Sequence, residues 1–131
     1  MDKARQEQLF QSFPELFDDG PDAPITQWGI EVKDGWYDIV VQLCKDLEIL
    51  RITRKSDTPK IRQLKSKFGQ LTIYLSDSDE VVEKIVANAV DHASHTCEDC
   101  GAPGELYRNR NRWYFIACTK HAGYAERVEK S

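Results

Sequence analysis

The sequence lacks the features that mark a membrane protein, a secreted protein or a common enzyme family. It has no apolar run long enough to span a bilayer, and its first residues contain no apolar signal core. Its seven glycines are scattered and form no phosphate-binding loop, and it has only three histidines. The Cys/His/Glu pattern of zinc deaminases and the His-Glu-x-x-His helix of metalloproteases are missing. We therefore expect a cytoplasmic protein that is not an enzyme.

An overall excess of basic residues is missing as well. The formal net charge is −4 over 131 residues, which argues against indiscriminate coating of nucleic acid. The charges are unevenly distributed along the sequence. Among the charged residues of segment 1–38, nine are acidic and three are basic, whereas segment 51–67 carries seven basic residues and one acidic residue, Asp57. We expect these segments to be solvated or paired within the fold. The alternative is that the polarity steers a charged partner.

Cysteine and histidine are concentrated near the C-terminus in two pairs, Cys97-Glu-Asp-Cys100 and Cys118-Thr-Lys-His121. A gap of two residues lets a turn direct both side chains of a pair at one ion, and three thiolates with one imidazole complete the tetrahedral shell of a structural zinc site. We predict one Zn²⁺ bound by Cys97, Cys100, Cys118 and His121. His92 or His95, just upstream, is the alternative to His121.

Two further side chains with reactive chemistry are predicted to take no part in catalysis. Glu98 adjoins a predicted zinc ligand, but we expect the acid in this turn to point outward. Cys44 falls on an apolar helical stripe with no histidine near it in the sequence. We expect its thiol to be buried and inert.

The hydrophobic pattern predicts an α+β fold in a single domain, residues 1–131, with an N-terminal arm at 1–24, a core at 25–94 and a zinc-binding module at 95–131. Helical periodicity predicts two main helices, over 36–50 and 79–94, and a short helix before Pro14 in the arm, whose phenylalanines should dock on the core. Alternating residues predict strands at 28–32 and 69–75, which we expect to pair in a small antiparallel sheet.

The last segment is predicted to form a zinc finger. Two strand-like runs, 105–108 and 113–117, flank a polar turn and predict a β-hairpin. We expect a polar helix over 120–130 whose first turn carries His121, which is the layout of a treble clef. A zinc ribbon is the alternative, in which the second ligand pair lies on another turn.

Arginine and aromatic side chains gather at the hairpin turn, where Arg108, Arg110 and Arg112 precede Trp113 and Tyr114. Nucleic-acid-binding proteins use such side chains to contact phosphates and bases. A solvated turn is the interpretation we favour, because the whole chain is acidic. The three arginines, with Arg54 and Lys55 of the basic segment, are candidate contacts to nucleic acid or a partner if both groups lie on one side.

Three strings occur in order: Asp34-Gly-Trp-Tyr-Asp-Ile-Val40, Lys65-Ser-Lys-Phe-Gly-Gln-Leu71, and Ser94 to Gly104 followed by Cys118-x-x-His121. In this combination the chain resembles a group of small zinc-binding proteins encoded by bacteriophages and prophages. The resemblance covers residues 28–121. It implies a phage origin, a zinc-binding turn and action in the bacterial host cytoplasm, but no mechanism.

These features lead to three hypotheses about function. The first is a non-enzymatic phage accessory protein that binds and modulates a host protein, such as a defence or transcription component. The second is a zinc-finger regulator that binds nucleic acid. The third is a zinc-dependent nuclease or deaminase. Neither a membrane nor a small-molecule substrate is expected as a partner, and the acidic arm and the hairpin turn are the candidate contact surfaces.

Overall fold

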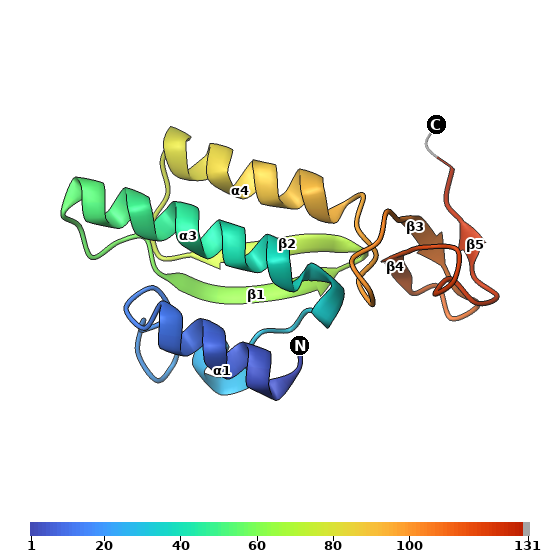
Figure 1. Ribbon diagram of the computed structural model, residues 1–131, viewed down its shortest axis with the longest axis horizontal. Helices are drawn as coiled ribbons and strands as arrows, with labels where there is room; N and C mark the ends of the chain where they lie inside the picture. Colours follow the sequence, from blue (N-terminus) through green and yellow to red (C-terminus); the bar gives the residue numbers. More distant parts are fainter. Residues whose placement is uncertain (130–131) are drawn as a thin grey trace.

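The computed structural model describes residues 1–129, which form an α+β core with a small module at one end (Figure 1). A hairpin of two strands, β1 (Ile61–Lys67) and β2 (Gln70–Leu75), runs through the core. Helices α3 (Tyr37–Arg54) and α4 (Glu80–Ala93) lie on one side of it, and α1 (Lys3–Ser12) lies on the other. We call residues 95–129, at the right of the figure, the C-terminal module.

The two main helices are confirmed, and their ends follow from local chemistry. A 3-10 turn, η1 (Asp34–Trp36), leads into α3, which runs past its predicted end and stops where Lys55 adopts a left-handed conformation with φ 53°. Asp79 caps α4, because its carboxylate accepts hydrogen bonds from the backbone N–H groups of Val81 and Val82.

The predicted pairing of the sheet is wrong. Strand β2 pairs with β1 instead of residues 28–32, because Phe68 and Gly69, with φ 54° and 78°, form a tight two-residue turn that suits the twist of a hairpin. Pro24 is the first residue of a short helix, α2 (Pro24–Trp28), as proline favours. Of the segment predicted as a strand, Glu31 alone forms an isolated parallel bridge, to Lys65.

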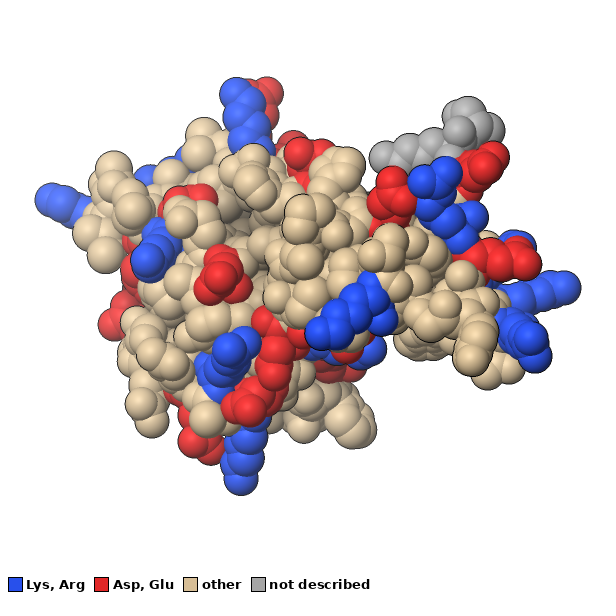
Figure 2. All heavy atoms as spheres, turned by 45° about the vertical axis from the view of Figure 1, so that its right-hand side comes forward, with Lys and Arg blue, Asp and Glu red and all other residues tan. Residues whose placement is uncertain are grey.

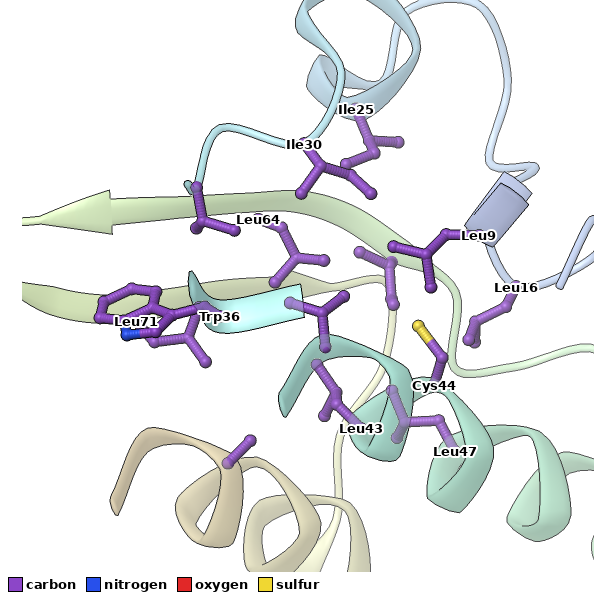
Figure 3. Close-up of a cluster of buried hydrophobic side chains, with 14 of the residues drawn as sticks. Leu9, Leu16, Ile25, Ile30, Trp36, Leu43, Cys44, Leu47, Leu64 and Leu71 are labelled. Carbon is purple, nitrogen blue, oxygen red and sulfur yellow. The ribbon is translucent and has the colours of Figure 1, made fainter. Parts of the chain in front are cut away.

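The hydrophobic core is built from side chains of the helices α1 to α4, the turn η1 and the strands β1 and β2 (Figure 3). Its largest fully buried side chains include Leu9, Leu16, Ile25, Trp36, Leu43, Leu47, Leu64 and Leu71. The N-terminal arm docks on this core as predicted, since Phe17 is buried and meets Phe10 edge to face with ring centroids 5.0 Å apart. Cys44 is buried as predicted, and burial raises the pKa of its thiol well above the usual range.

The acidic arm and the basic segment pair with each other within the fold. Arg51 is buried and its guanidinium contacts the carboxylates of Glu15 at 3.3 Å and Glu48 at 2.7 Å. Arg62 pairs with Asp19, and the ammonium of Lys60 donates to two carbonyl groups of the arm. Internal pairing, the expectation favoured from the sequence, is therefore confirmed for these side chains.

The C-terminal module contains a three-stranded sheet in the order β4-β3-β5. Strands β3 (Glu105–Arg108) and β4 (Tyr114–Ala117) form the predicted hairpin, and β5 (Glu126–Arg127) pairs with the other edge of β3. The helix predicted from residue 120 is wrong over the described residues, because the chain turns with Gly123 at φ 59° and then extends along β3. Lys130, its predicted end, lies outside the described residues.

None of the helices within residues 1–129 combines the length and the apolar character that a membrane crossing requires.

Candidate metal centre

Two turns of the C-terminal module bring four potential ligands together: Cys97, Cys100, Cys118 and His121, whose ligand atoms all lie within 4.8 Å of one another. The Sγ atoms of Cys100 and Cys118 are 3.7 Å apart, and Nδ1 of His121 lies 3.7 Å from Sγ of Cys97 and 3.1 Å from Sγ of Cys118. Two thiolates on a tetrahedral zinc ion, with Zn–S bonds of about 2.3 Å, are about 3.8 Å apart. The donor chemistry and the Cys100–Cys118 separation are therefore compatible with a bound metal ion.

The first ligand pair lies on a tight turn between α4 and β3. The N–H of Gly101 donates to the carbonyl of Cys97 at 3.0 Å, and Gly101 closes the turn with φ 81°, a conformation that glycine adopts without strain. The N–H of Cys97 donates in turn to the carbonyl of Ala102 at 2.7 Å. These bonds close the turn on which Cys97 and Cys100 lie.

The second pair lies on a turn that follows β4 directly. The backbone N–H groups of His121 and Ala122 both donate to the carbonyl of Cys118, at 3.1 and 3.0 Å. This turn brings the imidazole into the cluster, whereas His92 and His95 are exposed near the end of α4 and lie outside it. Both ligand pairs are therefore carried by turns, not by a helix.

The thiols of the cluster influence one another. Desolvation opposes ionisation of Cys118, but hydrogen bonds from the N–H of His121 and from the thiol of Cys100 lower its pKa. At Cys100 a hydrogen bond from the N–H of Ala102 favours the thiolate, yet desolvation and the neighbouring thiols raise its pKa.

The first ligand turn is docked on the core by two residues of η1. The N–H of Gly35 donates to the carbonyl of Glu98 at 2.8 Å, and the indole N–H of buried Trp36 donates to the carbonyl of Thr96 at 2.8 Å. A Cβ atom on Gly35 would lie 2.2 Å from the carbonyl oxygen of Cys97. The Gly-Trp string therefore allows the backbone of η1 to contact the backbone of the ligand turn.

The prediction that Glu98 points outward is wrong. Its side chain is buried, and its carboxylate accepts a hydrogen bond of 2.6 Å from the N–H of Ile116. The backbone N–H of Glu98 donates to the carbonyl of Ile116 at 2.9 Å. Glu98 therefore joins the first ligand turn to β4, next to the second ligand pair. A single acid within a turn carries no sequence signal for such a role.

The predicted basic contact residues fall into two groups that the fold keeps apart. Arg54 and Lys55 lie at the end of α3 that points away from the C-terminal module, which carries Arg108, Arg110 and Arg112 (Figure 1). The condition that both groups share one side of the molecule is not met. Arg54 is also paired, with Asp79.

The three module arginines instead line one surface cavity of about 470 Å³ with Tyr114, Tyr124 and Glu126. Sequence reasoning missed Tyr124, which lies in the segment predicted to be helical. Its side chain is 98 % exposed, and pairing of β5 with β3 brings this segment beside the hairpin. Knowledge of that strand pairing was needed to find the residue.

Comparison with protein-family models, curated proteins and solved structures finds no match to this chain.

Proposed function

We propose that the C-terminal module binds one Zn²⁺ as a structural ion through Cys97, Cys100, Cys118 and His121. Three thiolates and an imidazole are the donors of structural zinc sites, and four protein ligands leave no position for a reacting water. This donor set supports a protein that is not an enzyme. The two ligand turns and the three-stranded sheet favour a zinc-ribbon-like module over a treble clef.

We further propose that the chain is a phage accessory protein that binds and modulates a protein of its bacterial host, in the host cytoplasm. The observation that carries this proposal is the exposure of two aromatic side chains at the end of the module. Trp113 is 65 % exposed and follows Arg112 in the sequence, and Tyr124 is 98 % exposed and lines the cavity of the three arginines. Tryptophan, tyrosine and arginine are the residues that dominate binding energy at protein interfaces. Trp113 directly precedes β4 and Tyr124 lies in the turn before β5, so a metal-bound module would limit the backbone entropy lost on binding.

The N-terminal arm, the other contact surface considered, is less suited to this role. Phe17 is buried in the core, and Glu15 and Asp19 are paired with Arg51 and Arg62. Contact by this segment would require breaking packing and ion pairs already made within the chain. The exposed end of the C-terminal module is therefore the surface we assign to the partner.

Binding of nucleic acid is the second candidate function. It is favoured by the three arginines and two tyrosines at one cavity, which offer contacts to phosphates and stacking to bases. Against it stands the distance of Arg54 and Lys55 from this cavity, which leaves no extended basic footprint.

A pull-down from bacterial lysate, without chelator and with one half treated with nuclease, tests the proposed function. The variants are Trp113→Ala/Tyr124→Ala and, as a matched control, Trp28→Ala, which removes an aromatic ring that is 71 % exposed on the core. We expect wild type and Trp28→Ala to retain the same host protein after nuclease treatment, and the double variant to lose it. Retention that disappears with nuclease would indicate nucleic acid instead.

A further inference from the structure

Most arginines of the described chain are already engaged by other residues of the protein. Those with partners are Arg5, against the ring of Tyr37, and Arg51, Arg54, Arg62 and Arg127, each paired with a carboxylate. Within residues 1–129, the guanidinium groups of Arg108, Arg110 and Arg112 make no ion pair and no side-chain hydrogen bond. These three arginines, which have no side-chain partner among the described residues, line one cavity.

The cavity is formed by elements that the metal cluster would hold in place. Arg108 is the last residue of β3 and pairs in register with Tyr114 on one side and Glu126 on the other. The turn between β3 and β4 supplies Arg110 and Arg112. The N–H groups of Asn111 and Trp113 both donate to the side-chain oxygen of Asn109, at 2.9 and 3.0 Å, which orders this turn. The guanidinium groups are thus mounted on an ordered scaffold.

The charge of the cavity selects an anionic ligand. Its lining has three guanidinium groups against one carboxylate, that of Glu126, and two phenolic rings. Figure 2 shows basic side chains projecting at the end of the molecule that carries the module, with acidic side chains close to them. A guanidinium offers a planar pair of donors that matches a carboxylate or a phosphate.

We infer that the cavity of Arg108, Arg110 and Arg112 binds carboxylate side chains from an acidic segment of the partner protein. The inference rests on the proposed function and names the chemistry of the partner. A carboxylate is favoured over a nucleic-acid backbone because of the size of the basic region. Single strands bind along basic grooves several nucleotides long, whereas the basic region here is a single cavity.

The test measures binding of labelled probes to the zinc-loaded protein by fluorescence anisotropy at low ionic strength. The probes are a dodecapeptide of alternating glutamate and glycine, the same peptide with glutamine in place of glutamate, and an oligothymidylate of twelve nucleotides. The test variant is Arg108→Gln/Arg110→Gln/Arg112→Gln. Its control, Lys45→Gln/Lys67→Gln/Lys84→Gln, removes the same charge from exposed positions outside the cavity.

We expect the glutamate peptide to bind wild type and the lysine control with dissociation constants within about twofold, and the arginine variant about tenfold more weakly. The glutamine peptide should not bind. Should the arginine variant lose its zinc, Arg108→Lys/Arg110→Lys/Arg112→Lys replaces it. That variant keeps the charge but not the planar fork, and it should bind the peptide more weakly than wild type.

Three results would overturn the inference: tighter binding of the oligothymidylate than of the glutamate peptide, equal binding of the peptide by wild type and the arginine variant, or no binding at all. None of them decides the proposed function. If the host protein is still lost with Trp113→Ala/Tyr124→Ala and kept with Trp28→Ala, the proposed function stands and only the acidic ligand is wrong.

Discussion

Replacing Gly35 with alanine should separate the first ligand turn from the core. Gly35 is not in the left-handed region, so the backbone itself accepts alanine, and the effect depends on contacts alone. The added Cβ would lie 2.2 Å from the carbonyl oxygen of Cys97 and 2.5 Å from that of Glu98. Both obstacles are backbone atoms of the turn that carries the predicted zinc ligands, so no side-chain rotation relieves the clash.

The expected cost combines two effects. Overpacking of a filled site costs about 1–3 kcal/mol. Moving η1 away by about 1 Å, the shift needed to restore a normal contact, also breaks the hydrogen bond of 2.8 Å from the N–H of Gly35 to Glu98, worth about 1 kcal/mol net. We therefore expect Gly35→Ala to lower the free energy of unfolding by about 2–4 kcal/mol and to weaken zinc binding about tenfold or more.

Urea unfolding of the zinc-loaded protein and competition for zinc with a chromophoric chelator measure these two quantities. Gly20→Ala is the control, because Gly20 has φ 87° and no atom within 4 Å of the added Cβ. It should cost about 1 kcal/mol through backbone strain and leave zinc affinity unchanged. A Gly35→Ala protein with wild-type stability and wild-type zinc affinity would refute the docking of the ligand turn on η1.

Three further predictions concern the cysteines, the buried Arg51 and the capping Asp79. Chelation of the zinc should expose Cys97, Cys100 and Cys118 to a thiol reagent. Cys44 should stay unreactive, because it is buried in the hydrophobic core and not in the C-terminal module. Reaction of all four thiols together would contradict this prediction. Arg51→Ala should lower the free energy of unfolding by about 2–3 kcal/mol, because it leaves Glu48 without its partner. Lys45→Ala, at an exposed position, is the control and should change this free energy by less than about 0.5 kcal/mol. Urea unfolding measures both values. The side-chain hydrogen bond from Arg54 and the N–H of Val82 lower the pKa of Asp79, so its contribution to stability is present above the unfolded pKa of about 4 and is lost as the pH falls through the folded value. Asp79→Asn should therefore flatten the pH dependence of urea unfolding below about pH 4, and an unchanged slope would count against the pairing.

The main helices and the β3–β4 hairpin could be predicted because their signals are local. The apolar stripes of α3 and α4 depend only on neighbours in the sequence. The ligand set was accessible for the same reason, since each pair needs only a turn. His121 could be preferred to His92 and His95 on spacing alone.

Strand β1 was missed because its burial does not alternate. Ile61 and Leu64 are its fully buried residues, three positions apart, and an irregularity in register between Ile61 and Gln63 accounts for the broken period. Because β1 carries no periodic signal, the sequence pattern predicts residues 28–32 as the partner of β2. The alternation of residues 28–32 is real, since Ile30 and Val32 are buried, but their backbone pairs with the sheet only at the Glu31–Lys65 bridge.

The remaining errors concern contacts between segments that are distant in sequence. The C-terminal helix was expected from polar composition, whereas pairing of β5 with β3 directs the chain into a strand. The burial of Glu98 depends on a hydrogen bond to Ile116, eighteen residues away. Tertiary hydrogen bonds of this kind leave no periodicity in the sequence, so they could not be inferred from it.

The central claim is that the last part of the chain is organised by one zinc ion on four named ligands. Elemental analysis of metal per chain, on protein purified without chelator, tests it most directly in wild type, His121→Ala and His92→Ala. We predict one zinc per chain in wild type and His92→Ala, and a clear loss in His121→Ala. A wild-type protein without zinc, or a His121→Ala protein with full zinc content and unchanged thermal stability, would contradict the account.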